Sequence, residues 1–150
     1  IKRNVYADRL AGYKLALREF GFEFDPNLVI GNSLVERTGP DAANQILKMK
    51  KLPDGIFTAN DASGVACIRE IQKAGLKVPD DIGVVGFNND LISTVIQPSL
   101  TTINYPGWEM GEIAATTLIS KLRNDPTGNL DSIVLKHELI IRESSLRNKS

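Results

Sequence analysis

Residues 78–103 read VPDDIGVVGFNNDLISTVIQPSLTTI, and this stretch decides the fold. It contains a short apolar run rich in β-branched residues, Ile82 to Phe87, between the polar groups Pro79-Asp80-Asp81 and Asn88-Asn89-Asp90. Such a run is typical of a strand that is buried on both faces, as in a parallel sheet. Because ligands of open α/β sheets bind beyond the carboxyl ends of the strands, we expect Asn88 and Asn89 to lie near a ligand.

The segments on either side of this strand alternate between helical and extended patterns. Helices are predicted over residues 8–20, 38–51 and 62–74, and strands over residues 28–30, 56–59, 82–87 and 101–103. Asp8 can cap the first helix, and Gly21 can end it in a left-handed conformation. The alternation predicts βαβ units, and therefore an α/β fold with a parallel sheet and helices on both of its faces.

The chain beyond residue 103 follows a different pattern. Residues 108–123 predict an amphipathic helix, with an apolar stripe of Met110, Ile113, Ala114, Thr117, Leu118 and Leu122. A loop over residues 124–129 and an extended segment over residues 133–141 follow. The last segment, residues 142–150, is polar, and we expect it to fray.

The composition excludes several classes of protein. The chain has 150 residues, 42% of them hydrophobic and 24% charged, which suits one ordinary soluble domain. Its formal net charge is zero, whereas nucleic-acid-binding domains usually carry a basic surplus, so the chain alone is a poor candidate for contact with DNA. No apolar run approaches the length of a membrane span. Because the sequence opens on Ile1 and not on methionine, we expect a fragment of a longer protein.

The sequence lacks the motifs of common enzymes and metal sites. There is no P-loop, HExxH, GxSxG or GxGxxG pattern. Cys67 is the single cysteine and is expected to be a small core residue. His137 is the sole histidine and has no cysteine near it. We therefore expect neither catalysis nor a cofactor nor a bound metal.

Four stretches resemble one known family. VPDDIGVVGFNN followed by PSLTTI resembles the effector-binding domain of the lactose-repressor (LacI/GalR) family of bacterial transcription regulators. RLAGY at residues 9–13, IFTANDASGV at residues 56–65 and LIIRESS at residues 139–145 are similar to other segments of that domain. The resemblance implies a periplasmic-binding-protein-like α/β fold, in which two subdomains enclose a ligand cleft. It also implies an N-terminal helix-turn-helix headpiece that binds operator DNA.

The resemblance implies a division of the chain. Residues 1–104 and 130–145 correspond to the second subdomain, and residues 105–129 carry a helix of the first subdomain, most of which is absent together with the headpiece. Burial of each large apolar side chain stabilises by roughly 1.5–3 kcal/mol, so the stripe of the 108–123 helix is too long to leave in water. We expect this helix to pack against a second copy, to dock on its own sheet, or to be disordered in isolation.

The resemblance also implies the residues of an effector site. Arg9 would bind the effector, because a guanidinium can donate to two neighbouring hydroxyls or to a carbonyl. Asn60 would face the ligand and Asp61 would be structural, although either residue could instead cap the following helix. Asn88 stands where many family members carry an acid, which leaves the chemical type of the effector open.

Two more positions complete the implied effector site. Leu34 resembles the position of an aromatic or apolar ligand platform. Tyr105 follows the 101–103 strand, where the chain lines the cleft. Trp108 could line the cleft as well or belong to the core of its helix, and of the two aromatic residues we favour Tyr105 for the ligand.

The resulting hypothesis is a cytoplasmic sensor that controls transcription. A small molecule, a sugar or a related metabolite, would bind the cleft and set whether the paired headpieces of a homodimer fit their operator. The main alternative is a periplasmic sugar-binding protein of a transporter, which shares the fold and the cleft. The PSLTTI segment and the RESS ending favour the regulator. A metabolic α/β enzyme is the third reading.

Overall fold

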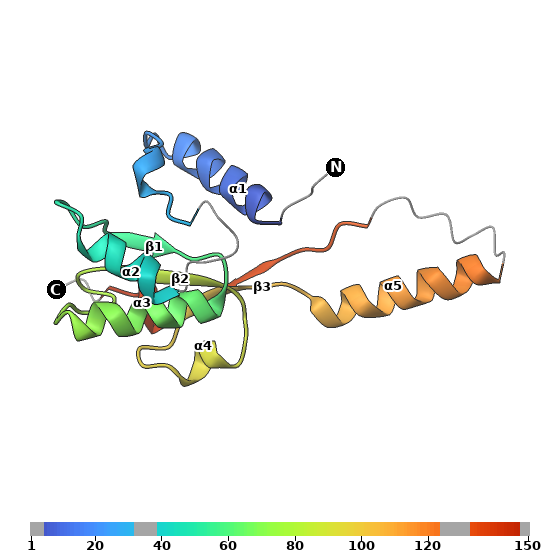
Figure 1. Cartoon of the computed structure of the whole chain (residues 1–150). Coiled ribbons are helices and arrows are strands. Elements are labelled where there is room, and N and C mark those ends of the chain that lie inside the picture. Colours follow the sequence, from blue (N-terminus) through green and yellow to red (C-terminus); the bar gives the residue numbers. More distant parts are fainter. Residues whose placement is uncertain (1–4, 32–38, 124–132, 148–150) are drawn as a thin grey trace.

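A four-stranded sheet forms the centre of the molecule (Figure 1). The computed structural model describes residues 5–31, 39–123 and 133–147. The strands lie in the order β1 (Gly55–Phe57), β2 (Gly83–Asn88), β3 (Thr101–Asn104) and β4 (Glu138–Ile140). β1, β2 and β3 are parallel, and β4 pairs with β3 in the antiparallel direction. The predicted α/β fold is therefore confirmed, and its parallel strands are joined by an antiparallel strand, β4, whose direction was not predicted.

Helices lie on both sides of this sheet (Figure 1). In the described chain they are α1 (Val5–Glu19), α2 (Gly39–Leu47), α3 (Asp61–Lys73), α4 (Ile92–Val95) and α5 (Gly107–Leu122), with short 3-10 helices at Pro26–Leu28 and Glu143–Ser145. α3 packs against β2 and against α2. α1 lies on the opposite face, where Arg9 stacks over Phe87, whereas Val84 faces α3.

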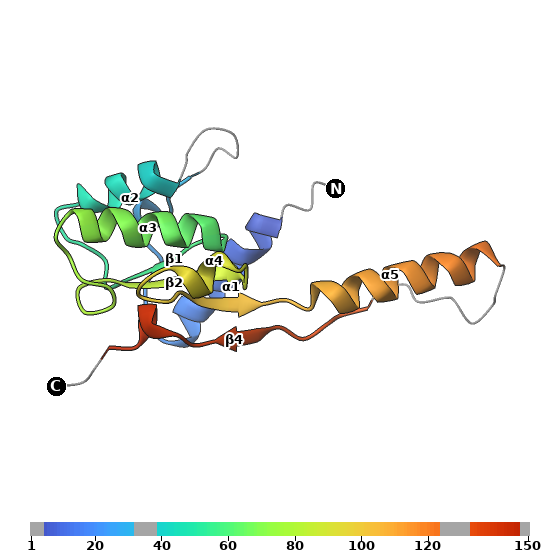
Figure 2. The same cartoon turned by 90° about the horizontal axis from the view of Figure 1, so that it is seen from below.

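The strand pair β3–β4 carries the chain away from the sheet and back (Figure 2). α5 follows β3 and extends outward from the sheet, and β4 returns beside β3. No residue of α5 is buried, and Trp108 at its start is 87% exposed. Two of the three outcomes expected for this helix are therefore wrong, since it neither docks on its own sheet nor loses its helical structure. None of the described helices combines the length and the apolar composition that a membrane span requires.

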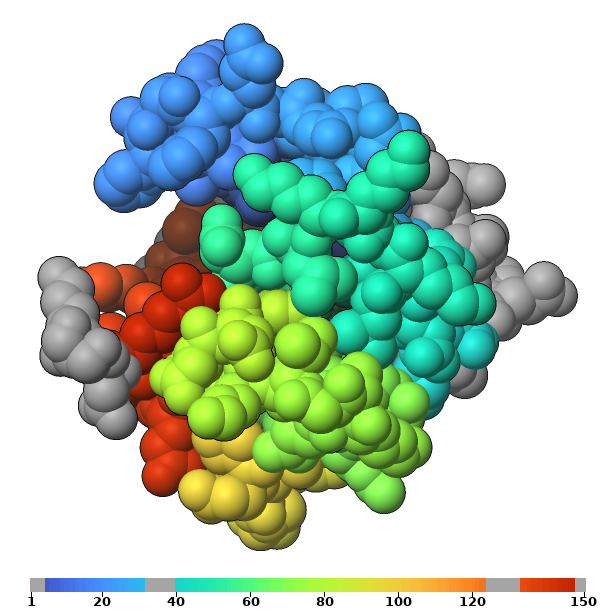
Figure 3. All heavy atoms as spheres, turned by 90° about the vertical axis from the view of Figure 1, so that its left-hand side faces the viewer, coloured from blue at the N-terminus to red at the C-terminus, as the bar shows by residue number. Residues whose placement is uncertain are grey.

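Residues 5–31 form a separate lobe above the rest of the molecule (blue in Figure 3). No residue of α1 is fully buried. Helical spacing predicts an inner face of four apolar residues, and three of them, Leu10, Tyr13 and Leu17, are half-buried, whereas Phe20 is 78% exposed. Gly21 ends the helix segment with φ +76, as expected for a left-handed terminator. The prediction that Asp8 caps α1 is wrong, because the helix begins at Val5 and places Asp8 in its first turn.

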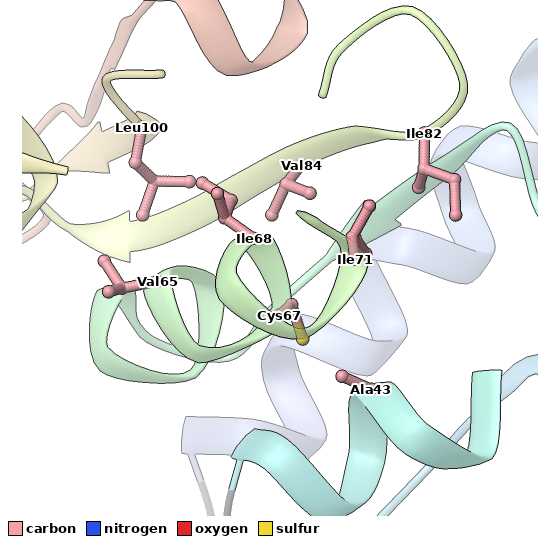
Figure 4. Packing of buried hydrophobic residues seen from close by; sticks show 8 residues of the cluster. All are labelled: Ala43, Val65, Cys67, Ile68, Ile71, Ile82, Val84 and Leu100. Atoms are coloured by element: carbon pink, nitrogen blue, oxygen red, sulfur yellow. The ribbon is translucent and has the colours of Figure 1, made fainter. Parts of the chain in front are cut away.

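The core lies between α3 and the sheet (Figure 4). One side of α3 faces β2 and the residues that precede β2 and β3, and α2 closes the cluster at Ala43; the members are Ala43, Val65, Cys67, Ile68, Ile71, Ile82, Val84 and Leu100. Cys67 is a core residue, as predicted, and its burial raises the pKa of the thiol to about 11. The thiol therefore remains protonated, and unreactive, at neutral pH.

The predicted strand over residues 28–30 is absent. Pro26–Leu28 forms a 3-10 helix, and Val29 and Ile30 lie outside any strand. The side chain of Asp25 accepts a hydrogen bond from the Asn27 N–H at 2.8 Å. Local capping by Asp25, together with a proline that has no N–H to donate, favours a turn over the extended run that the apolar residues suggested.

The predicted fraying of residues 142–150 is wrong for the part that the structure describes. Ser144 is completely buried; its hydroxyl donates to the Val84 carbonyl at 2.6 Å and accepts from the Thr101 N–H at 2.8 Å. The Arg147 guanidinium donates to the carbonyls of Asp54 and Pro79. Residues 142–147 are thus held against the sheet, and residues 148–150 lie outside the described chain.

Candidate ligand-binding site

Polar side chains gather at the carboxyl ends of the three parallel strands. Asn60 lies shortly after β1, Asn88 ends β2, and Asn104 ends β3. The register pairs Asn88 with Asn104, which fixes these two residues side by side. Because parallel strands present their carboxyl ends at one edge, the three amides share the edge where ligands of such sheets bind.

Arg9 reaches this edge from α1. Its guanidinium donates to the carbonyl of Ala59, the residue before Asn60. It also stacks over the ring of Phe87, the residue before Asn88, with Cζ 3.7 Å from the ring centroid. The structure therefore brings Arg9 against the residues that precede Asn60 and Asn88, although these segments are far apart in the sequence.

Asn60 is the N-cap of α3. Its side-chain oxygen accepts from the Ser63 N–H at 2.8 Å, which is the capping role left open as the alternative to ligand binding. The cap fixes the orientation of the amide group and directs its oxygen into the helix end. A ligand at Asn60 would consequently meet the amide nitrogen, which is a hydrogen-bond donor.

Asp61 is a buried hub beneath the site, as its predicted structural role requires. The carboxylate is fully buried and accepts from the Thr102 hydroxyl at 2.6 Å and from the Asp90 N–H at 2.7 Å. A Cβ at position 86 would overlap its Oδ1 and lie 2.8 Å from Leu100 Cδ2. The glycine in GVVGFNN is thus needed for close packing of β2 against Asp61 and Leu100.

Residues 88–90, which we name the ligand loop because they follow β2 at the candidate site, have an unusual backbone. Asn89 has φ 59, in the left-handed region that asparagine tolerates better than most residues, whereas Asn88 has φ 122, a positive value beyond that region. The Asn88 amide nitrogen lies 3.3 Å from the exposed carboxylate of Asp90. Strained backbone of this kind persists where surrounding contacts hold it, and it is common at ligand sites.

Sequence reasoning missed the mutual contact of Asn89 and Arg142, although the sequence also allowed Asn89 to be a turn residue with a left-handed backbone, as its φ of 59 shows it to be. The Arg142 guanidinium donates to Asn89 Oδ1 at 2.8 Å, to Ser93 Oγ at 2.9 Å and to the Leu100 carbonyl at 2.9 Å. Asn89 Nδ2 donates to Asn104 Oδ1 at 3.2 Å. The resemblance of LIIRESS to a closing strand was the available signal, but it did not indicate which loop the arginine contacts.

The remaining predicted site residues differ in position. Tyr105 directly follows Asn104, so it lies at the same edge of the sheet, and it is 38% exposed. Trp108, at 87% exposed, belongs to no core in the described chain. Leu34 lies outside the described residues.

The turn over residues 97–99 is fixed by hydrogen bonds to Glu143. Its carboxylate accepts from the Ser99 N–H at 2.7 Å, the Ser99 hydroxyl at 2.9 Å and the Gln97 amide at 3.2 Å. The backbone hydrogen bond from Ser99, followed by the bond from its hydroxyl, lowers the pKa of Glu143 below its ordinary value. This turn lies just before β3 in the chain.

The edge is suited to reversible binding of a polar molecule. It presents one guanidinium, several amides, the ring of Tyr105 and the exposed Asp90 carboxylate, which together can donate to and accept from a polyhydroxylated ligand. Within residues 5–31, 39–123 and 133–147, no cluster of histidine, cysteine and acidic side chains could hold a metal ion.

Comparisons with known proteins agree with this architecture. Residues 2–145 match the family described as periplasmic binding protein-like domain. The HTH-type transcriptional regulator RegA of Clostridium saccharobutylicum is 34% identical over 143 residues, which cover 95% of this chain and 43% of RegA. The chain thus spans about two fifths of the length of the curated relatives it matches.

Solved structures of transcriptional regulators have the same fold. The complex of the regulator CelR with cellobiose superposes with a TM-score of 0.80 at 31% identity, covering 92% of this chain and 42% of CelR. A LacI family regulator from Lactobacillus casei with bound sucrose gives a TM-score of 0.73 at 26% identity, covering 91% of this chain and 50% of that protein.

Proposed function

Because this chain belongs to the periplasmic-binding-protein-like family, in the form found in LacI-type transcriptional regulators, we propose that it is the second half of an effector-sensing domain. The complete protein binds a small molecule between two subdomains. Binding changes the affinity for operator DNA of a helix-turn-helix headpiece that lies outside this chain. The regulator acts in the cytoplasm as a homodimer, so that two headpieces bind one operator.

The convergence of Arg9, Asn60 and Asn88 carries the proposal. The Arg9 guanidinium contacts the residue before each of the two asparagines, at the carboxyl edge of a parallel sheet. Stacking on the Phe87 ring holds the guanidinium plane in position and leaves its other N–H groups for a ligand. Tyr105, at the same edge, adds an aromatic ring, and Leu34 completes the proposed set.

The ligand we propose is a sugar or a related polar metabolite. Solved structures of two similar regulators contain cellobiose and sucrose. Asn88 both donates and accepts, so it binds a hydroxyl or a carbonyl equally well and is less selective than an acid for hydroxyl donors. The candidate effectors therefore include hydroxylated molecules that also carry a carbonyl group.

We further propose that residues 105–129 belong to the other subdomain of the complete protein, and that residues 1–104 and 130–145 form the one described above. The absence of buried residues in α5 supports this division. Its exposed apolar side chains, such as Leu118 and Leu122, would then be buried against segments that lie outside this chain.

The test uses the full-length gene product. A thermal-shift screen with monosaccharides, disaccharides and nucleosides should identify a molecule that raises the melting temperature, because a ligand that binds the folded state stabilises it. Arg9→Ala should abolish this shift and the effector response while operator binding persists. Arg69→Ala, at an exposed arginine in the C-terminal half of α3, is the matched control and should behave as the wild type.

Two results would contradict the proposal. An unchanged effector response in the Arg9→Ala protein would remove Arg9 from the site. A sugar-dependent shift without binding to DNA fragments from the promoters near the gene would instead favour a sugar-binding protein of a transporter.

A further inference from the structure

We propose that Asn89 is a coupling residue: it links the ligand loop to the two strands that carry the chain out to α5 and back. The inference rests on the proposed function, since it assigns a role to the residue next to the ligand-binding Asn88. Asn89 itself need not touch the ligand. It acts as a positioning residue through its contacts with Thr102, Asn104 and Arg142.

All three of these contacts join the ligand loop to β3 or to the residues just after β4. The Asn89 N–H donates to the Thr102 hydroxyl at 3.3 Å, and the side-chain nitrogen donates to Asn104 Oδ1 at 3.2 Å. The side-chain oxygen accepts from Arg142 at 2.8 Å. Thr102 and Asn104 belong to β3, and Arg142 follows β4 by two residues. The loop is therefore attached to β3 and to the chain just after β4.

These two strands are the connection to α5. Asn104 pairs with Glu138 and Thr102 pairs with Ile140, so β3 and β4 lie side by side in opposite directions. Beyond Asn104 the chain runs through Tyr105 and Pro106 into α5, which extends away from the sheet (Figure 2). Any displacement of α5 relative to the sheet must pass through this strand pair.

Arg142 makes the attachment sensitive to its own position. Its half-buried guanidinium has only neutral acceptors, on Asn89, Ser93 and Leu100, among the residues that the structure describes. Neutral acceptors fix a guanidinium by geometry, because each bond depends on distance and angle. A shift of Arg142 therefore breaks its bond to Asn89 or moves the loop.

The consequence is a two-way link between ligand and strand pair. Asn88 would touch the ligand, and Asn89, its neighbour in the chain, is hydrogen-bonded to Asn104 and Arg142. A ligand that binds better when these bonds are formed also favours the strand position that forms them, since coupling between two sites is reciprocal.

Hydrogen exchange measured by mass spectrometry on the full-length protein without ligand tests the link. Asn89→Gly removes the side chain yet accepts φ 59 without strain. It should speed exchange about tenfold in the ligand loop and also in residues 101–105 and 138–142, because a hydrogen bond to a charged partner is lost. Exchange in α3 should not change. Asn104→Ala should have a smaller effect, and adding it to Asn89→Gly should change nothing further.

Two control variants separate coupling from general destabilisation. Asn89→Asp keeps an acceptor for Arg142 and lets the Asn104 amide rotate to donate, so wild-type exchange should return. Glu143→Gln disturbs the neighbouring Gln97–Ser99 turn and should speed exchange there but not in the ligand loop.

Three results would overturn the inference. These are faster exchange confined to residues 88–90, an equal increase in α3, or additive effects of the Asn89 and Asn104 substitutions. The exchange experiment is carried out without ligand, so a failed ligand screen would not affect its outcome. Conversely, additive effects of the Asn89 and Asn104 substitutions on exchange would leave the proposed effector binding intact.

Discussion

At the scale of single residues, the candidate site depends on the lack of a side chain at Gly86. Gly86 lets β2 approach the buried Asp61 carboxylate, which in turn accepts the N–H of Asp90 in the ligand loop. The same carboxylate accepts the Thr102 hydroxyl of β3. One glycine thus allows helix α3, strand β3 and the ligand loop to share a single anchor.

Gly86→Ala should disrupt this anchor. The added methyl group overlaps Asp61 and Leu100, and overpacking of this kind costs about 1–3 kcal/mol of unfolding free energy. Chemical denaturation of both proteins measures the difference. Gly111→Ala, in α5, is the control. An added methyl group there meets nothing within 4 Å outside the backbone of its own helix, and alanine favours a helix over glycine by about 1 kcal/mol, so this variant should lose no stability. Equal stability of the Gly86→Ala protein and the wild type would refute the packing argument.

At the scale of elements, the turn over residues 97–99 depends on a charge. Glu143 accepts two hydrogen bonds from Ser99 and one from Gln97, and these bonds lower its pKa in the folded protein. A folded-state pKa below the unfolded one means that the unfolded state binds the proton more readily. The contribution is therefore fully present above the unfolded-state pKa and is lost as the pH falls through the folded-state pKa.

Glu143→Gln should remove this pH dependence. The variant should be less stable than the wild type at neutral pH, because a neutral amide accepts more weakly than a carboxylate. The difference should shrink in acid, once the pH has fallen below the lowered pKa of Glu143 and the wild-type carboxyl is protonated. Urea midpoints at neutral and at acidic pH measure it. A difference that stays constant across this range would show that the charge of Glu143 does not contribute.

At the scale of the whole molecule, α5 and the sheet are separate bodies joined by two strands. No α5 residue is buried, so the helix adds little to the stability of the sheet in this chain. Replacing residues 106–136 with Asn-Gly, which forms the tight turn of a two-residue hairpin, should join β3 directly to β4.

The shortened chain should unfold with a free energy within about 0.5 kcal/mol of the original, as expected when only exposed groups are removed. It should also bind less of a hydrophobic dye, because the apolar face of α5 is gone. Circular dichroism melts and dye fluorescence on the two chains measure both effects. Loss of a cooperative transition in the shortened chain would mean that α5 supports the sheet.

The sequence alone determined the parallel sheet, the core face of α3 and the polar residues at the strand ends. These depend on local patterns: apolar runs, helical spacing and the residue types that follow each strand. The grouping of Arg9 with Asn88 in one proposed site came from the family resemblance. The Asn60 cap was only one of two alternatives, because an asparagine at a helix start can face either the helix or a ligand.

Only the tertiary structure decided which distant segments meet. The contacts of Arg142 with Asn89, of Ser144 with Val84 and of Asp61 with Thr102 join residues that are 41 to 60 positions apart. A polar ending such as RESSLR has the composition of a solvated tail. It is ordered here because its side chains satisfy buried carbonyls and N–H groups of the sheet, and no local pattern records those partners.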